Sequence, residues 1–103
     1  GLSVDDTAPV ARELAELGVD WIGVSGNHCG FGEKLTADFP YFAPYARIVH
    51  DALRGAIPLD CAGGIRSAKT ANEMLGGGCG SCDLACIGRP FWSDPKFIEA
   101  WKR

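Results

Sequence analysis

The chain has 103 residues, of which 47% are hydrophobic and 22% are charged, and its formal net charge is −3. A chain of this length forms one small domain, so residues 1–103 are treated as a single unit. The weak negative charge gives no reason to expect nucleic acid or a membrane as a partner. No apolar run approaches the ~18 residues of a membrane span, and the N-terminal residues do not resemble a secretion signal. We therefore expect a cytoplasmic protein.

Apolar residues in the first part of the chain recur at helical spacing and predict a helix over residues 2–17. Ser3 and Asp6 have the spacing of a capping box at the start of this helix. Pro9 would remove a hydrogen bond from the helix interior, so a start near Thr7 is the alternative. The sequence leaves this boundary open.

A mostly apolar run over residues 19–25 follows and predicts a strand of a parallel sheet, covered on both faces. Residues 26–40 are glycine-rich and aperiodic, and a loop of that length in a small domain is usually functional or mobile. Beyond this loop, helical and strand-like segments alternate, each bounded by a capping residue, a proline or a glycine. The later predicted elements are a helix over 44–53, a strand from 57 to the glycines at 63–64, a helix over 68–75 capped by Ser67, a strand over 84–87 and a last helix beginning at Asp94.

Alternating helices and strands with short connections predict an α/β fold, in which flanking helices cover parallel strands joined by right-handed crossovers. Three strands are too few for a complete domain of this type, because a (β/α)8 barrel needs eight strands and about 250 residues. The chain corresponds to about three βα units of such a TIM barrel. We expect it to be part of a larger protein or to associate with itself, because its sheet edges would otherwise stay unpaired.

Two of the predicted strands end at glycine, and their ends form a candidate anion site. The second strand ends at Gly63 and Gly64, and the third ends at Gly88 and Arg89. In a parallel sheet such ends lie at the same edge, where backbone N–H groups can approach an anion without a Cβ atom in the way. Arg89 can add two parallel charge-assisted hydrogen bonds. These four residues are the predicted phosphate site.

Simpler explanations exist for these signals. A glycine pair after a strand often serves only as the tight turn into a helix, and Arg89 could form an ion pair at the surface. Arg66 is expected to be a solvated residue at a helix start. His28 and Cys29 are not expected to act as base and nucleophile, because adjacent side chains seldom face each other correctly. Other aromatic residues are expected to pack in the core or on helix faces: Trp21, Trp92, Trp101, Tyr41 and Tyr45.

Five cysteines are present, an odd number, which does not suggest a disulfide framework. Cys79 and Cys82 have the spacing of a redox or metal motif, and a zinc or iron–sulfur site would add Cys86 and a fourth ligand such as His28 or Cys61. The sequence has no second pair with this spacing, and Cys86 lies in a predicted strand, where cysteine packs as a small hydrophobe. We predict reduced thiols and no metal site, and assign no role to Cys79, Cys82 or Cys86.

The segments Cys61–Arg66 and Ala85–Pro90 resemble the old yellow enzyme family of FMN-dependent NAD(P)H:flavin oxidoreductases. The likeness covers nearly the whole chain, in the family's order, but only the last three strands of the family's barrel. The other segments that carry it are Gly1–Asp6, Gly18–Gly26, Tyr41–Ala46 and Phe91–Pro95.

The resemblance implies that residues 1–103 are the C-terminal segment of an FMN-binding barrel in an ene-reductase-like enzyme. In the family the FMN phosphate is held after the seventh and eighth strands, and the matching positions are Gly63, Gly64, Gly88 and Arg89. The family uses NAD(P)H as reductant and acts on a small-molecule substrate. Its flavin-ring contacts and proton donor come from earlier strands, so the resemblance assigns no catalytic residue to this chain.

Two other functions fit the same residues. Phosphate-binding barrel enzymes of other classes, such as isomerases, aldolases and synthases, share the site through architecture alone. A non-catalytic half barrel would also bind phosphate weakly and associate with itself.

Overall fold

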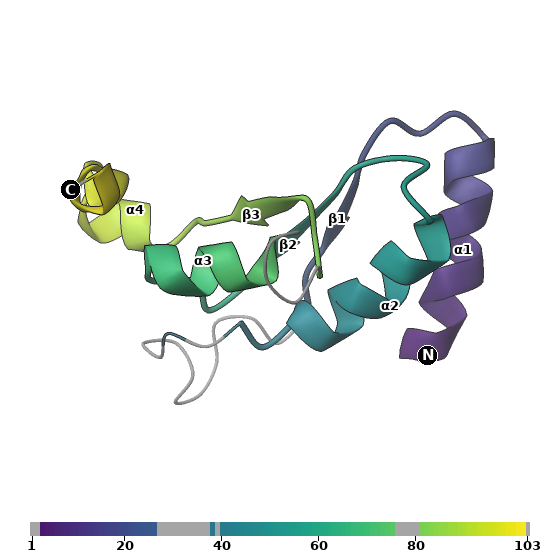
Figure 1. The fold of residues 1–103 in the computed structure, drawn as a ribbon, viewed down its shortest axis with the longest axis horizontal. Coiled ribbons are helices and arrows are strands. Elements are labelled where there is room, and N and C mark those ends of the chain that lie inside the picture. Colours follow the sequence, from purple (N-terminus) through teal and green to yellow (C-terminus); the bar gives the residue numbers. More distant parts are fainter. Residues whose placement is uncertain (1–2, 27–37, 39, 76–80, 103) are drawn as a thin grey trace.

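The computed structural model describes residues 3–26, 38, 40–75 and 81–102. Within them, helices and strands alternate along the chain in the predicted order (Figure 1). None of the helices in this part of the chain has the length and apolar composition that crossing a membrane requires. The elements are α1 (Val4–Glu16), β1 (Ile22–Val24), α2 (Ala43–Leu53), β2 (Leu59–Ala62), α3 (Ala68–Met74), β3 (Leu84–Cys86), α4 (Pro90–Ser93) and the 3₁₀ helix η2 (Phe97–Lys102).

The three strands form one parallel sheet in the order β1-β2-β3. β2 lies in the middle, where Cys61 is opposite Val24 of β1 on one side and Ala85 of β3 on the other. The helices flank this sheet (Figure 1), so the predicted α/β class with a parallel sheet is confirmed.

The buried core lies between one face of the sheet and helices α2 and α3. Leu59 and Cys61 of β2 point to this face and are both 0% exposed. Full burial of one aliphatic side chain contributes about 1.5–3 kcal/mol, so this face supplies much of the stability of the sheet. The helix residues that pack in the same core are Ala11 of α1, Ala43, Ala46, Val49 and Leu53 of α2, and Ala71 and Met74 of α3.

The opposite face of the sheet is largely uncovered within the described part of the chain. Leu84 of β3 is 44% exposed, and Cys86 is exposed as well. Their partners on β2, Asp60 and Ala62, are half-buried. The expectation that the first strand is covered on both faces is wrong, because Gly23 of β1 is exposed. Cys86 is exposed, so the expectation that it packs as a small hydrophobe is wrong as well. The helices that the structure describes pack on one face of the sheet. Three strands are too few to form a closed barrel around the other face.

The start of α1 has the predicted capping box. The carboxylate of Asp6 accepts hydrogen bonds from the Ser3 backbone N–H at 2.7 Å and from the Ser3 hydroxyl at 3.0 Å. These bonds, the backbone one first, lower the pKa of Asp6 from its ordinary value of 3.8. The helix begins at Val4 and contains Pro9, so the alternative start near Thr7 is wrong. The capping bonds stabilise a first turn that precedes the proline.

The C-terminal region differs from its prediction. The short helix α4 precedes Asp94, and the segment after Asp94 is the 3₁₀ helix η2 rather than an α-helix. The Asp94 carboxylate accepts the N–H of Lys96 at 3.0 Å, which stabilises a turn between the two helices. Phe97 and Trp101 then pack edge to face with their ring centroids 5.4 Å apart. The predicted apolar face is present on a tighter helix.

The aromatic residues only partly follow their prediction. Trp101 of η2 is half-buried and packs against Phe97 and the core as expected, whereas Trp21 is 54% exposed and Trp92 is 83% exposed. The prediction of core or helix-packing roles is therefore wrong for Trp21 and Trp92. Tyr45 lies on α2 and is 46% exposed, and Tyr41 lies before α2 rather than on a helix face.

Leucines on the two faces of the sheet should respond differently to truncation. Leu59→Ala removes a fully buried side chain, so we expect it to lower the free energy of unfolding by about 2–5 kcal/mol. Leu84→Ala, on the uncovered face, should cost less than about 1 kcal/mol. Urea denaturation followed by circular dichroism measures both values. An equally large loss for Leu84→Ala would contradict the uncovered face and would indicate that association buries it.

Candidate phosphate-binding pocket

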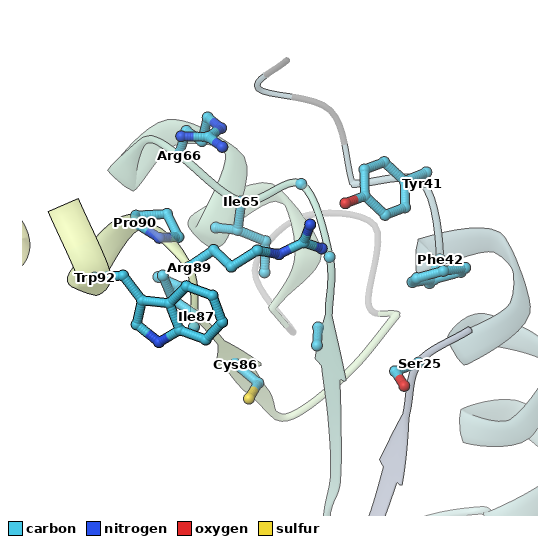
Figure 2. A pocket seen from close by; sticks show the side chains of 14 residues that line it. Ser25, Tyr41, Phe42, Ile65, Arg66, Cys86, Ile87, Arg89, Pro90 and Trp92 are labelled. Atoms are coloured by element: carbon cyan, nitrogen blue, oxygen red, sulfur yellow. The ribbon is translucent and has the colours of Figure 1, made fainter. Parts of the chain in front are cut away.

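The ends of the three strands open into one pocket with a volume of about 530 Å³ (Figure 2). Ser25 follows β1, Gly63 and Gly64 follow β2, and Gly88 and Arg89 follow β3. The two glycine-ended segments therefore line the same pocket, as the predicted phosphate site requires. The other lining residues are Tyr41, Phe42, Ala62, Ile65, Arg66, Cys86, Ile87, Pro90 and Trp92.

The end of β2 has a backbone conformation that needs glycine. Gly63 and Gly64 have φ angles of 103° and 77°, in the left-handed region that residues with a Cβ atom disfavour. Gly63 also has no room for a side chain, because a Cβ atom there would lie 2.7 Å from ring carbons of both Tyr41 and Phe42. The two aromatic rings thus pack directly on the backbone at the end of β2.

The end of β3 is more open and carries the cationic side chain. A Cβ atom added at Gly88 would meet nothing within 4 Å. The carbonyl oxygens of Gly88 and Arg89 accept the N–H groups of Phe91 and Trp92 at 3.0 and 2.9 Å, which turns the chain into α4 directly after the strand. Figure 2 shows Arg89 extending into the pocket toward the segment that follows β2.

Two arginines line the pocket, and they are oriented differently. The side chain of Arg66 is directed away from the guanidinium of Arg89 (Figure 2). Arg89 is half-buried and forms no ion pair with any residue that the structure describes. The structure therefore gives no support to a surface ion pair as the role of Arg89, and it leaves this guanidinium as the cationic group that points into the pocket.

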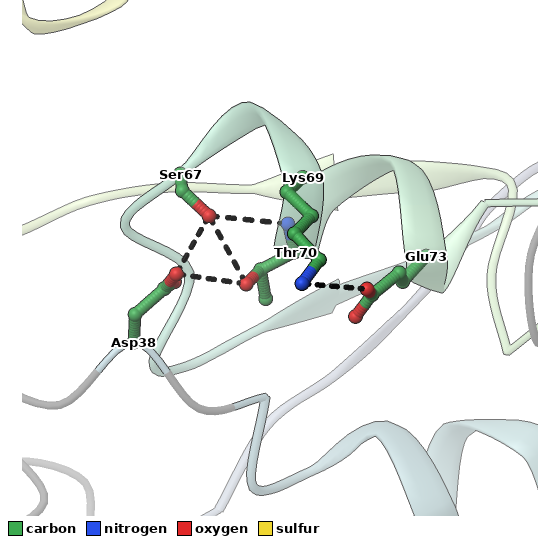
Figure 3. A network of polar contacts seen from close by, with 5 residues as sticks. All are labelled: Asp38, Ser67, Lys69, Thr70 and Glu73. Carbon is green, nitrogen blue, oxygen red and sulfur yellow. Dashed lines mark hydrogen bonds and ion pairs between the residues drawn. The ribbon is translucent and has the colours of Figure 1, made fainter.

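The N-terminus of α3, beside the pocket, is held by an aspartate (Figure 3). Oδ1 of Asp38 accepts the backbone N–H of Arg66 at 2.8 Å, and Oδ2 accepts the hydroxyls of Ser67 at 2.6 Å and Thr70 at 2.9 Å. Ser67 also caps the helix as predicted, because its hydroxyl oxygen accepts the Thr70 N–H at 3.2 Å. The N–H groups of Arg66 and Thr70 at the start of α3 therefore already donate to side-chain oxygens of the protein. An anion would instead have to accept hydrogen bonds from the backbone at the strand ends.

The ionisation of Asp38 depends on this network. Desolvation opposes the charged form, but hydrogen bonds from Ser67, the Arg66 N–H and Thr70 outweigh it and lower the pKa of Asp38 from its ordinary value of 3.8. Asp38 lies in the segment predicted only as a loop, and no local sequence pattern indicates its role. Its partners lie about 30 residues further along the chain, at Arg66, Ser67 and Thr70.

Sequence reasoning missed several residues that line the pocket. Tyr41 and Trp92 are predicted to pack, Phe42 receives no predicted role, and Ser25 is predicted only as the end of a strand. A signal for Tyr41 and Phe42 was available, because they close a long loop that starts at a strand end and therefore return the chain to the same edge of the sheet. No local pattern marked Trp92, which becomes a wall of the pocket only because α4 turns there.

The cysteines have different environments. Cys61 and Cys82 are buried, whereas Cys86 is exposed and lines the pocket. Cys79, His28 and Cys29 lie outside the described residues. Among the residues that the structure describes, no cluster of histidine, cysteine or carboxylate side chains could hold a metal ion.

Comparison with known proteins leaves the family open. No protein-family model matches the chain, and a search of curated proteins also finds no match. The resemblance to the old yellow enzymes therefore rests on the sequence segments given above.

Asp38→Asn should remove a pH-dependent contribution to stability. Because folding lowers the pKa of Asp38, the carboxylate stabilises the fold above its unfolded pKa, and this contribution is lost as the pH falls through the lower folded value. At neutral pH we expect a lower urea midpoint for the variant than for the wild type. The difference should shrink below pH 3.8.

The control for this change is Asp51→Asn, which removes the same charge from the surface of α2. Asp51 pairs with Arg47 at 3.9 Å with both side chains exposed, so its loss should leave the urea midpoint nearly unchanged. A deficit for Asp38→Asn that stays constant from neutral pH to well below pH 3.8 would show that the charge of Asp38 does not stabilise the fold.

Proposed function

We propose that this chain is the C-terminal, phosphate-binding portion of a (β/α)8 barrel in an FMN-dependent NAD(P)H oxidoreductase that resembles the old yellow enzymes. The observation that carries the proposal is the pocket at the strand ends, which Gly63, Gly64, Gly88 and Arg89 line together. These are the positions that the resemblance assigns to the FMN phosphate.

The uneven burial of the sheet supports the barrel part of the proposal. In a (β/α)8 barrel, helices cover the outer face of the strands, and side chains of the inner face fill the interior. In this chain the helix-covered face holds Leu59 and Cys61, and the other face holds the exposed Leu84 and Cys86. Further barrel strands, or a second copy of the chain, would bury that second face.

The hydrogen-bond donors at the strand ends suit a phosphate, but their number predicts only weak binding by residues 1–103 alone. Two or three hydrogen bonds to a charged group contribute about 1.5–3 kcal/mol each, which is roughly 3–9 kcal/mol before ordering costs. A free energy of about 4.1 kcal/mol corresponds to millimolar affinity and about 8.2 kcal/mol to micromolar affinity. Tight retention of a flavin would therefore need contacts from the rest of a barrel.

The walls of the pocket fit the remainder of a flavin nucleotide. Phe42, Ile65, Ile87 and Trp92 line it beside the guanidinium of Arg89, which combines apolar surface with one cationic group. Bound FMN supplies hydride-transfer chemistry between NAD(P)H and a small-molecule substrate. The residues of this chain bind and orient the phosphate end, and we assign none of them a catalytic role.

FMN and riboflavin differ only in the phosphate group, so their comparison tests the proposed site. We expect the chain to bind FMN with a Kd between about 1 µM and 1 mM and riboflavin more weakly. Arg89→Ala should raise the Kd for FMN by at least about tenfold, because it removes charge-assisted hydrogen bonds to the phosphate. Titration followed by flavin fluorescence measures these values.

Arg66→Ala is the matched control, because it removes an arginine from the same pocket whose side chain is directed away from Arg89 (Figure 2). It should change the Kd for FMN by less than about threefold. Equal affinity of the wild-type chain for FMN and riboflavin would contradict the phosphate site. Preference for a sugar phosphate over FMN would instead favour a phosphate-binding barrel enzyme of another class.

A further inference from the structure

Tyr41 is a polar residue that lines the pocket. The phosphate site described above does not use it. Its ring packs edge-on against Phe42, with centroids 4.9 Å apart and ring planes at 84°. The ring also lies against Gly63, where an added Cβ atom would come within 2.7 Å of Cε2 of Tyr41. These contacts hold the tyrosine at the end of β2, beside the proposed phosphate position.

The hydroxyl of Tyr41 points into the pocket. Figure 2 shows it and the guanidinium of Arg89 directed toward the same part of the pocket from opposite sides. Tyr41 is half-buried, and its hydroxyl has no hydrogen-bond partner within the part of the chain that the structure describes. A tyrosine hydroxyl can donate one hydrogen bond, and here it can donate it to a ligand group in the pocket.

The Tyr41 hydroxyl and the Arg89 guanidinium are both hydrogen-bond donors, and together they complement the oxygens of a phosphate monoester. A phosphate monoester has three terminal oxygens, and an arginine engages two oxygens through its parallel N–H groups. The third oxygen can then accept from another donor, and a phenol O–H donates without adding charge. A carboxylate has only two oxygens, so beside the same arginine it offers the tyrosine fewer acceptor sites than a phosphate does.

We propose that Tyr41 is a ligand-binding residue whose hydroxyl donates a hydrogen bond to a terminal oxygen of the phosphate monoester held by Arg89. This inference rests on the proposed function, because it takes the phosphate to lie at the strand ends. Gly63 contributes indirectly, since its missing side chain lets the tyrosine ring approach the end of β2. The pair Tyr41 and Arg89 would make phosphate monoesters preferred over ligands that lack the phosphate, such as riboflavin.

Tyr41→Phe tests the proposal because it removes the hydroxyl and keeps the ring that contacts Phe42 and Gly63. We expect the Kd for FMN to rise about tenfold, with no change in the Kd for riboflavin or in the urea midpoint. Tyr45→Phe is the matched control, because Tyr45 is 46% exposed on α2 and does not line this pocket. It should leave both Kd values and the urea midpoint unchanged.

The outcomes separate this inference from the proposed function. Unchanged FMN affinity in Tyr41→Phe, together with weaker binding in Arg89→Ala, would overturn the role of Tyr41 and leave the phosphate site in place. An equal loss of affinity for FMN and riboflavin would also overturn it, because the hydroxyl would then contact a part that both ligands share. A wild-type chain that does not distinguish the two ligands would overturn both proposals.

Discussion

The pairing of β2 with a parallel strand on each side is the constraint on which the pocket depends. Val24, Cys61 and Ala85 lie opposite one another, so the three strands end at the same edge of the sheet. A shift of one residue in this register would move each side chain of β2 to the other face and expose Leu59 and Cys61. The burial of these two residues therefore stabilises the core and also fixes where the strand ends meet.

The order of elements could be predicted from the sequence, because the signals for it are local. Helical spacing, the capping box at Ser3 and Asp6, and the cap at Ser67 all act within a few residues of the chain. The burial of Cys86 was predicted wrongly, because burial depends on how many strands and helices surround a sheet. A local pattern of apolar residues does not indicate how many strands and helices surround the sheet.

The site could be predicted only in part, for a related reason. The glycines and Arg89 lie within three residues of a strand end, so their position at the sheet edge follows from the chain order. The network of Asp38 and the contact of Tyr41 with Gly63 join segments more than 20 residues apart, and no spacing rule predicts them. Residues placed by tertiary contacts thus account for most of what the sequence left out.

Gly63 and Gly88 lie at the ends of neighbouring strands but differ in what surrounds them. The rings of Tyr41 and Phe42 fill the space beside Gly63, whereas the space beside Gly88 is open. One wall of the cavity is therefore set by the packing of the fold, and the other can accept new atoms. Progressively larger side chains at Gly88 would narrow the cavity step by step, so the size of anion that it admits could be engineered while the sheet stays intact.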